Sequence, residues 1–282
     1  MIINHNLPGA TALNFLNKNA ASASGSMEKL SSGLKINKAA DDAAGLSISQ
    51  KMQSQINGLD VATSNAQDGV SLLQTAEGGL NETQAILQRM NELATQSAND
   101  TNVTLDRSAI SAELGTLGDE IDHISQATNF NGVNLLSSGG PSTTITFQIG
   151  ATSNTFDSIG LNLASIDMNS ATLSVGNSAT GTVLDVSTNT KATAAMSTIQ
   201  AAIDKVSTSR SYIGSLQNRL THTINNVSTE KQNLTTASAN ITDVDMAKEM
   251  MNYSKENVLQ QAAQSMLSQA NQNPQQVLKL LQ

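Results

Sequence analysis

Apolar residues recur along the chain at alternating intervals of three and four positions, a pattern typical of helices that pack through a narrow seam. Glycines at positions 33 and 45 flank a stretch of mixed charge, and glycine ends helices readily because it tolerates left-handed backbone angles. We therefore expect a first helix that ends in a break within residues 33–45. Its seam consists of Leu13, Leu16, Ala20, Ala23, Met27, Leu30 and Leu34.

The same spacing then predicts a helix over residues 46–98, about 80 Å long at 1.5 Å per residue. Polar Thr63, Glu77 and Gln84 occupy seam positions within it. After a turn at residues 97–102, a shorter series with the same spacing predicts an antiparallel partner helix. The apolar positions of that partner are Ile110, Leu114, Leu117, Ile121 and Ile124.

The pattern changes at Asn129, where turn-forming residues replace the heptads. Residues 139–190 contain no lysine or arginine and are rich in Ser, Thr, Asn and Gly. Ile145, Phe147 and Ile149 alternate with polar residues, as in a strand with one buried face. We expect short strands, hairpins and exposed turns in this segment.

Helical spacing returns over residues 196–241, and a last helix follows the stretch ITDVD. Pro274 lacks a backbone donor, so we expect it to kink or end that helix. The predicted fold is mainly α: a long coiled coil and helical bundle formed by both chain termini, with a small central segment that contains a β-hairpin. The apolar face of the last helix consists of Met251, Val258, Ala262, Met266 and Ala270, with Leu259, Ala263 and Leu267 beside it.

The final turn carries the apolar residues Val277, Leu278 and Leu281, where chain ends are usually polar and frayed. Pairing the amino-terminal stripe with the carboxy-terminal one would bury one seam and leave these residues uncovered. A two-helix hairpin of small side chains is also marginal in water. Further copies of the chain could supply the cover, because head-to-tail contacts that do not close produce open helical filaments.

Composition excludes several classes of function. Aromatic residues make up 2% of the chain, which suits thin helical seams better than a thick core. A net charge of −8 argues against nucleic acid or an anionic membrane surface as a partner. The absence of cysteine excludes disulfides and thiolate metal sites. We also expect no transmembrane helix and no cleaved signal peptide.

Residues that could carry catalysis or bind metal are few, and we expect no enzyme activity, no cofactor and no metal site. Asp41 and Asp42 could form a carboxylate pair, but capping of the following helix explains them more simply. His5, His123 and His222 have no neighbouring ligand at a metal-binding interval. No HExxH, Ser/His/Asp or phosphate-loop motif occurs.

Several stretches resemble the bacterial flagellins, the subunits of flagellar filaments. The resemblance covers nearly all of residues 1–136 and 191–282 and keeps its motifs in order. The matching stretches are LSSGLKINKAADDAAGLSIS (30–49), NAQDGVSLLQTAEGGLNE (65–82), QRMNELATQSAN (88–99), NFNGVNLL (129–136), ITDVDMAKEM (241–250) and VLQQAAQSMLSQANQNPQQVLKLLQ (258–282).

The resemblance implies a layered organisation. Residues 1–45 and 242–282 would form a coiled-coil domain that lines the filament channel. Residues 46–138 and 191–241 would form a helical bundle. Residues 139–190 would be a short variable segment of that bundle with a β-hairpin, and the outer domains of longer flagellins would be missing.

The resemblance further implies export through the flagellar type III apparatus, assembly outside the cell and a role in motility. The implied partners are further copies of the chain, an export chaperone, the filament cap and hook-junction proteins. Free subunits are expected to have mobile, protease-sensitive ends. The residues expected to mediate assembly are Leu13, Leu16, Met27, Leu30, Leu34, Asp41, Asp42, Val258, Leu259, Met266, Leu267, Val277, Leu278 and Leu281.

Arg89, Leu93 and Glu113 match positions with which some flagellins contact vertebrate Toll-like receptor 5. Arg89 and Leu93 are one helical turn apart, so one face would present a charge beside an aliphatic anchor. Glu113 would lie on the helix that runs back alongside. The alternative interpretation is a seam leucine and two solvated charges in an ordinary bundle.

Two other functions fit the sequence. A hook–filament junction protein has related terminal helices, and a secreted binding protein of a type III system would act as a monomer. Formation of long polymers by the purified chain would favour a filament subunit over both.

Overall fold

The computed structural model describes residues 6–137, 144–177 and 183–280, with side chains as far as Asn273. The chain forms two compact units, Met1–Ile56 with Gln232–Gln282, and Asn57–Lys231. Two long helices, α2 (Ala43–Ser97) and α5 (Asn189–Thr242), contribute to both units.

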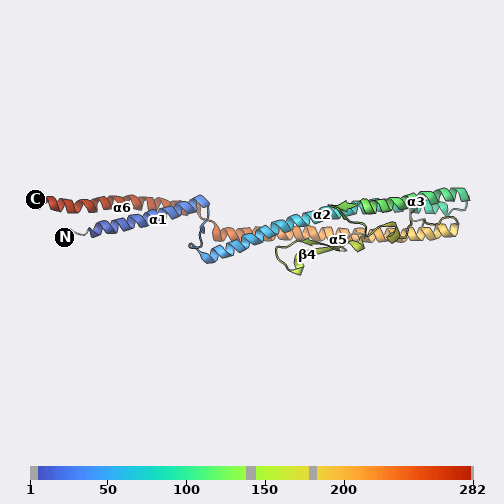
Figure 1. The fold of residues 1–282 in the computed structure, drawn as a ribbon, viewed down its shortest axis with the longest axis horizontal. Coiled ribbons are helices and arrows are strands. Elements are labelled where there is room, and N and C mark those ends of the chain that lie inside the picture. Colours follow the sequence, from blue (N-terminus) through green and yellow to red (C-terminus); the bar gives the residue numbers. More distant parts are fainter. Residues whose placement is uncertain (1–5, 138–143, 178–182, 281–282) are drawn as a thin grey trace. The chain divides into compact units, whose positions relative to one another are not determined.

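The first unit is built on α1 (Leu7–Ser32) and α6 (Met246–Leu280), which run antiparallel side by side (Figure 1). The Asn6 side chain accepts a hydrogen bond from the Gly9 N–H at 3.0 Å and caps the start of α1. Gly33 caps its end with a φ of 74°, in the left-handed region that glycine adopts without strain. The predicted break at Gly33 is therefore confirmed.

The last helix does not stop where the sequence suggested. α6 continues past Pro274 to Leu280, so of the two expected effects, a kink or an end, the proline does not end the helix. A proline removes one backbone hydrogen bond, and the neighbouring Gln, Leu and Lys residues favour helix strongly enough to carry it through.

The two connections of this unit pair with each other. Leu34 and Asp243 form an antiparallel bridge. The Lys35 N–H donates to the Thr242 carbonyl at 2.6 Å, and the Val244 N–H donates to the Gly33 carbonyl at 3.0 Å. These bonds satisfy backbone groups that the helix ends would otherwise leave free.

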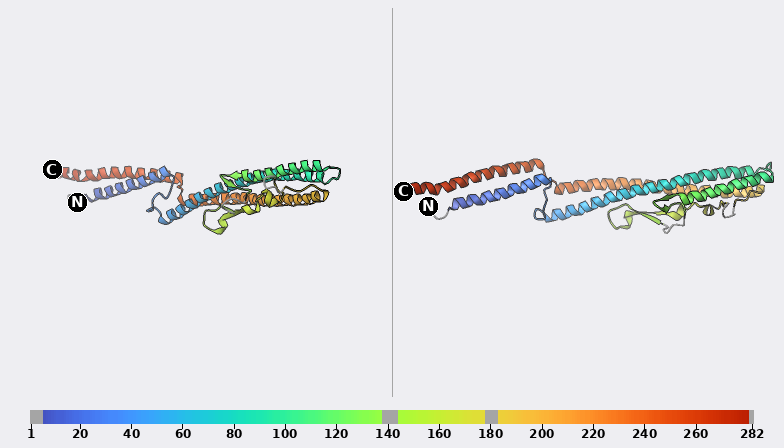
Figure 2. Two further views of the ribbon diagram at one scale, coloured as in Figure 1. Left: turned by 45° about the vertical axis from the view of Figure 1, so that its right-hand side comes forward. Right: turned by 45° about the horizontal axis from the view of Figure 1, so that its top comes forward.

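The second unit is a bundle of α2, α3 (Thr104–Ala127) and α5, and Figure 2 shows these helices from two further sides. α3 folds back beside α2, and α5 runs antiparallel to α2. The long helix and its shorter antiparallel partner are thus confirmed. The bundle core includes the fully buried Leu73, Leu80, Leu87, Met90, Leu114, Ile121 and Ile199.

Polar seam positions of α2 meet polar partners on α5. Glu77 accepts a hydrogen bond from Gln217 at 3.1 Å, and Gln84 accepts one from Arg210 at 2.5 Å. A shift of one helix along the other would leave these partly buried groups without partners, so the pairs help to fix the register.

The chain between α3 and α5 forms two small antiparallel strand pairs. β1 (Asn129–Phe130) and β2 (Val133–Asn134) form a hairpin whose turn residues, Asn131 and Gly132, both have positive φ. Such angles are those of the tight turns that suit hairpins. β3 (Thr144–Gln148) pairs antiparallel with β4 (Ser158–Asn162). The short helices of the segment are η1 (Thr155–Asp157), η2 (Leu163–Ser165) and α4 (Ser170–Leu173).

The described part of this central segment is more buried than predicted. The strands are confirmed, but the expectation of exposed turns is wrong for much of the chain after β4. Ile166, Met168 and Val186 are fully buried in the bundle core. Their spacing among Ser, Thr and Asn is irregular, so no helical or strand period marks them as core residues in the sequence.

Candidate functional site

The facing surfaces of α1 and α6 are lined by small and polar side chains. On α1 the shielded positions include a series at 3,4 spacing, Gly9, Ala12, Leu16, Asn19, Ala23, Ser26 and Leu30, with Ala20, Gly25 and Lys29 beside it. On α6 the shielded positions are Glu249, Tyr253, Glu256, Asn257, Gln260, Ala263, Leu267 and Ala270. A hydrogen bond from Ser26 lowers the pKa of Glu249, so part of this seam is polar.

This seam corrects the predicted pairing of the two stripes. Leu16, Ala23 and Leu30 lie in it as predicted, whereas Leu13 and Met27 point away. Met251, Val258 and Met266 also lie outside it. Small side chains let two helices approach closely, and the larger apolar side chains are consequently left on the outer faces.

An exposed apolar surface remains on each helix of the pair. Met27 is 50% exposed on α1, and Val258 and Met266 are 64% and 65% exposed on α6. Among the residues expected to mediate assembly, Leu13, Leu34 and Leu259 are also exposed, and Leu267 is half-buried. The side chains of Val277 and Leu278, and the whole of Leu281, lie outside the described residues.

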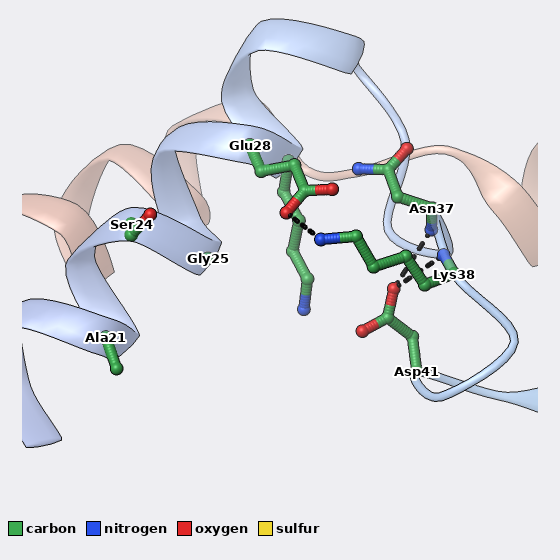
Figure 3. A pocket seen from close by; sticks show the side chains of 8 residues that line it. Ala21, Ser24, Gly25, Glu28, Asn37, Lys38 and Asp41 are labelled. Atoms are coloured by element: carbon green, nitrogen blue, oxygen red, sulfur yellow. Dashed lines mark hydrogen bonds and ion pairs between the residues drawn. The ribbon is translucent and has the colours of Figure 1, made fainter.

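Asp41 and Asp42 have different local roles. The Asp42 carboxylate accepts hydrogen bonds from the Ala44 and Gly45 N–H groups, at 3.1 and 3.0 Å, and so caps the start of α2 as predicted. Asp41 instead accepts from the N–H groups of Asn37 and Lys38, at 3.1 and 3.0 Å (Figure 3). These backbone bonds lower the pKa of Asp41.

Asp41 borders a shallow groove between α1 and this connection. Lys38 reaches across it to an ion pair with Glu28 at 2.6 Å, and the hydrogen bond between them raises the pKa of Lys38 (Figure 3). The groove is polar, in contrast to the apolar outer faces of α1 and α6. Its lining consists of Ala21, Ser24, Gly25, Glu28, Lys29, Asn37, Lys38 and Asp41.

Arg89 and Glu113 come together in the second unit, on α2 and α3. Their ion pair measures 3.0 Å, and Arg89 also pairs with Glu92 at 3.2 Å. The hydrogen bonds to Glu113 and Glu92 raise the pKa of Arg89. Leu93 is only 2% exposed and belongs to the bundle core. The structure thus brings the two charges together on the surface and places the leucine beneath it.

Several exposed apolar residues were missed as candidates. Phe156 in η1 is 93% exposed, and Phe15 in α1 is also exposed. Met246, Met250 and Met251 lie exposed at the start of α6. The sequence could have identified the two phenylalanines, because Phe156 stands alone among Ser, Thr and Asn and Phe15 falls outside the 3,4 seam of its helix.

The described residues contain no group of His, Asp or Glu side chains arranged to hold a metal ion. Within the same ranges, none of the helices is both long and apolar enough to cross a membrane.

Comparisons with known proteins agree along the whole chain. The family described as "Bacterial flagellin N-terminal helical region" matches residues 3–139, and "Bacterial flagellin C-terminal helical region" matches residues 196–281. The chain is 49% identical to a flagellin of Halalkalibacterium halodurans, with 100% of both chains covered. It is 46% identical to a flagellin of Bacillus subtilis and 42% identical to the flagellar filament 33 kDa core protein of Treponema phagedenis, again with 100% coverage of each chain.

Proposed function

The chain belongs to the bacterial flagellin family, and on that premise we propose that it is a structural subunit that polymerises with its own copies into a flagellar filament for motility. It acts by packing, without catalysis or a cofactor. Its partners are neighbouring copies, and it works outside the cell after type III export with the help of a chaperone, the filament cap and hook-junction proteins.

The observation that carries the proposal is the uncovered apolar surface on α1 and α6. Met27, Val258 and Met266 are half or more exposed on helices whose mutual seam combines small and polar groups with only a few larger side chains. Large apolar side chains left exposed on a helix face mark a candidate interaction site. In the filament, neighbouring copies cover these faces, and each weak seam gains strength from repetition.

The layered organisation follows from the same premise. We assign residues 1–45 and 242–282 to the layer around the filament channel, where the apolar faces meet. Residues 46–138 and 191–241 form the surrounding bundle, with residues 139–190 as its hairpin-containing segment. Asp41 and Asp42 hold the connection between the layers in shape and contribute polar contacts to neighbouring copies.

Paired substitutions on α6 test whether its apolar face is an assembly surface. Val258→Asp with Met266→Asp should raise the critical concentration for seeded polymerisation by at least about tenfold, because burying an unpaired charge is costly. The matched control, Gln261→Asp with Gln264→Asp, adds the same charge at exposed polar positions of the same helix. Light scattering and electron microscopy give the readout.

The critical concentration of the control variant should lie within about twofold of that of the unmodified chain, which corresponds to well under 1 kcal/mol. If the Val258/Met266 variant polymerised equally well, the apolar face would not be an assembly surface. If the unmodified chain formed no long polymers on seeds, a junction protein or a monomeric binding protein would replace the filament subunit as the preferred function.

We also propose that the subunit is a ligand of vertebrate Toll-like receptor 5, with Arg89 and Glu113 at the contact and Leu93 packed beneath them. The exposed ion pair between Arg89 and Glu113 supports this proposal, because an arginine held by an acid can serve as an ordered anchor. Leu93 acts from beneath by holding α2 against α3.

Receptor activation by the purified monomer tests this second function. Arg89→Ala should raise the concentration needed for half-maximal signalling in receptor-expressing cells by at least about tenfold, the effect of a hot-spot residue. Arg219→Ala, at an exposed arginine on α5, is the control and should leave signalling unchanged. Equal signalling by both variants would rule out the Arg89 contact.

A further inference from the structure

The methionines divide between the two units according to exposure. Met90 and Met168 are 0% exposed in the core of the second unit. The exposed methionines that the structure describes all lie in the first unit, on its two paired helices. They are Met27, Met246, Met250, Met251 and Met266.

These thioethers lie on or beside the apolar faces that α1 and α6 leave uncovered. On α6, Met251, Val258 and Met266 fall within a narrow arc of the helix, since their spacings of seven and eight residues are close to two turns. Met246 and Met250 are one turn apart and start the same helix. The exposed methionines therefore lie on helix faces that the isolated chain leaves open to solvent.

Oxidation would change such a surface sharply. Methionine sulfoxide is polar and chiral, and it disrupts apolar cores and methionine-rich interfaces. A sulfoxide on an outer face of α1 or α6 stays hydrated while the subunit is free. It would need a hydrogen-bond partner if an apolar neighbour covered it, and burial without one is unfavourable.

We propose that Met27, Met246, Met250, Met251 and Met266 form a peroxide-sensitive modification site that controls assembly of the free subunit. This proposal rests on the proposed filament function. A sulfur lone pair attacks one peroxide oxygen, the O–O bond breaks, and after proton transfer the other oxygen leaves as water. The sulfur loses two electrons to the peroxide and becomes a sulfoxide. Assembly in turn covers the thioethers and protects them from the oxidant.

Peptide mass spectrometry tests the site. The free subunit is treated with hydrogen peroxide, and the gain of one oxygen is followed at each methionine. The five exposed methionines should react at least about tenfold faster than Met90 and Met168, which serve as internal controls, because reaction follows exposure. In seeded filaments the oxidation rate of these five methionines should fall towards that of Met90 and Met168. Equal rates for both groups in the free subunit would overturn the assignment.

Seeded polymerisation tests the consequence. Chain oxidised at the five positions should show a critical concentration at least about tenfold higher than untreated chain. Treatment with methionine sulfoxide reductases and a dithiol, which returns sulfoxide to thioether, should restore polymerisation. Unchanged polymerisation despite complete conversion would overturn the proposal, as would a loss that the reductases fail to reverse.

A variant separates methionine oxidation from other damage. Replacing the five exposed methionines by leucine keeps their size and apolar character, so the variant should polymerise with or without peroxide. Loss of polymerisation by this variant after peroxide would place the sensitivity elsewhere and overturn the proposal. Failure of untreated, unmodified chain to polymerise would contradict the filament function, while the mass-spectrometric rates would still decide whether the five methionines are the reactive site.

Discussion

Gly118 lies where α3 closely approaches another segment of backbone. A Cβ atom built at this position would be 2.1 Å from the carbonyl oxygen of Gly176, well inside van der Waals contact. The carbonyl is a backbone group, and the position of a Cβ is fixed by its own backbone. Neither atom can therefore move aside through a change of rotamer. The residue is therefore set by packing: only a glycine allows the chain after α4 to lie against α3.

We predict that Gly118→Ala lowers the free energy of unfolding by about 1–3 kcal/mol, the usual cost of overpacking. Gly78→Ala is the control, since no atom lies within 4 Å of its added Cβ on α2. That variant should gain about 0.5–1 kcal/mol from its better helix propensity. Urea unfolding of the free subunit, followed by circular dichroism, measures both. Equal effects of the two substitutions would contradict the close approach.

Asp41 gives one connection of the first unit a pH dependence. Its pKa is lowered from 3.8 by hydrogen bonds from the Lys38 and Asn37 N–H groups. A carboxyl whose folded pKa is depressed contributes order that is present above its unfolded pKa and lost as the pH falls through the folded value. The connection should therefore be ordered at neutral pH and loosen below about pH 4.

Amide exchange at Asn37 and Lys38 measures this loosening. Protection of these two N–H groups, corrected for intrinsic exchange rates, should fall as the pH drops below the pKa of the carboxyl in the unfolded chain. Asp41→Asn should already be less protected at neutral pH and should lose the pH dependence. If protection in the unmodified chain stayed constant through the acid range, Asp41 would not order the connection.

At the scale of elements, the pairing of α1 with α6 rests on small side chains. Ala23 is 7% exposed in this seam, next to the half-buried Leu30 and Leu16. Close approach of two helices depends on such residues, because a longer side chain would force them apart.

We predict that Ala23→Leu separates α1 from α6 in the free subunit. Protease cleavage within α1 should become at least about threefold faster, because an unpaired helix of this length is marginal in water. Ala10→Leu, at an exposed position on the same helix, adds the same volume and should leave the cleavage rate unchanged. Equal rates for the two variants would show that Ala23 does not set the distance between the helices.

The heptad spacing predicted the helices but located the seam between α1 and α6 only in part. Leu13 and Met27 repeat at the same interval as Ala12, Ala23 and Ser26, so the pattern alone favoured the larger side chains. The Ala, Gly and Ser positions of this seam carry little hydrophobic signal. The residues that the sequence marked as a seam are for this reason often the ones left exposed.

The candidate receptor contact was also predicted only in part from the sequence. The antiparallel arrangement of α2 and α3 placed Arg89 near Glu113, and their ion pair confirms that proximity. The sequence could not decide whether Leu93 faced outward beside Arg89 or inward, because a residue one turn away can lie near the edge of either face. In the structure Leu93 faces inward and is buried in the bundle core.

At the scale of the whole molecule, the two units differ in what stabilises them. The second unit has a contiguous core of fully buried Leu, Ile and Met residues. In the first unit, the described parts of α1 and α6 contain few buried residues, namely Gly9, Ala23 and Ser26, all on α1. The hydrophobic contribution per residue is therefore much smaller there, since it scales with the apolar area removed from water. A filament would supply the missing area from neighbouring copies.

Whether neighbouring copies cover α6 is tested most directly by seeded polymerisation. The full chain is compared with a chain that ends at Ile241. Light scattering follows growth, and electron microscopy shows whether the products are long filaments. The full chain should elongate the seeds, and the shortened chain, which lacks α6, should not. Elongation by the shortened chain at a similar rate would show that α6 is dispensable and that its exposed apolar face is not what neighbouring copies cover.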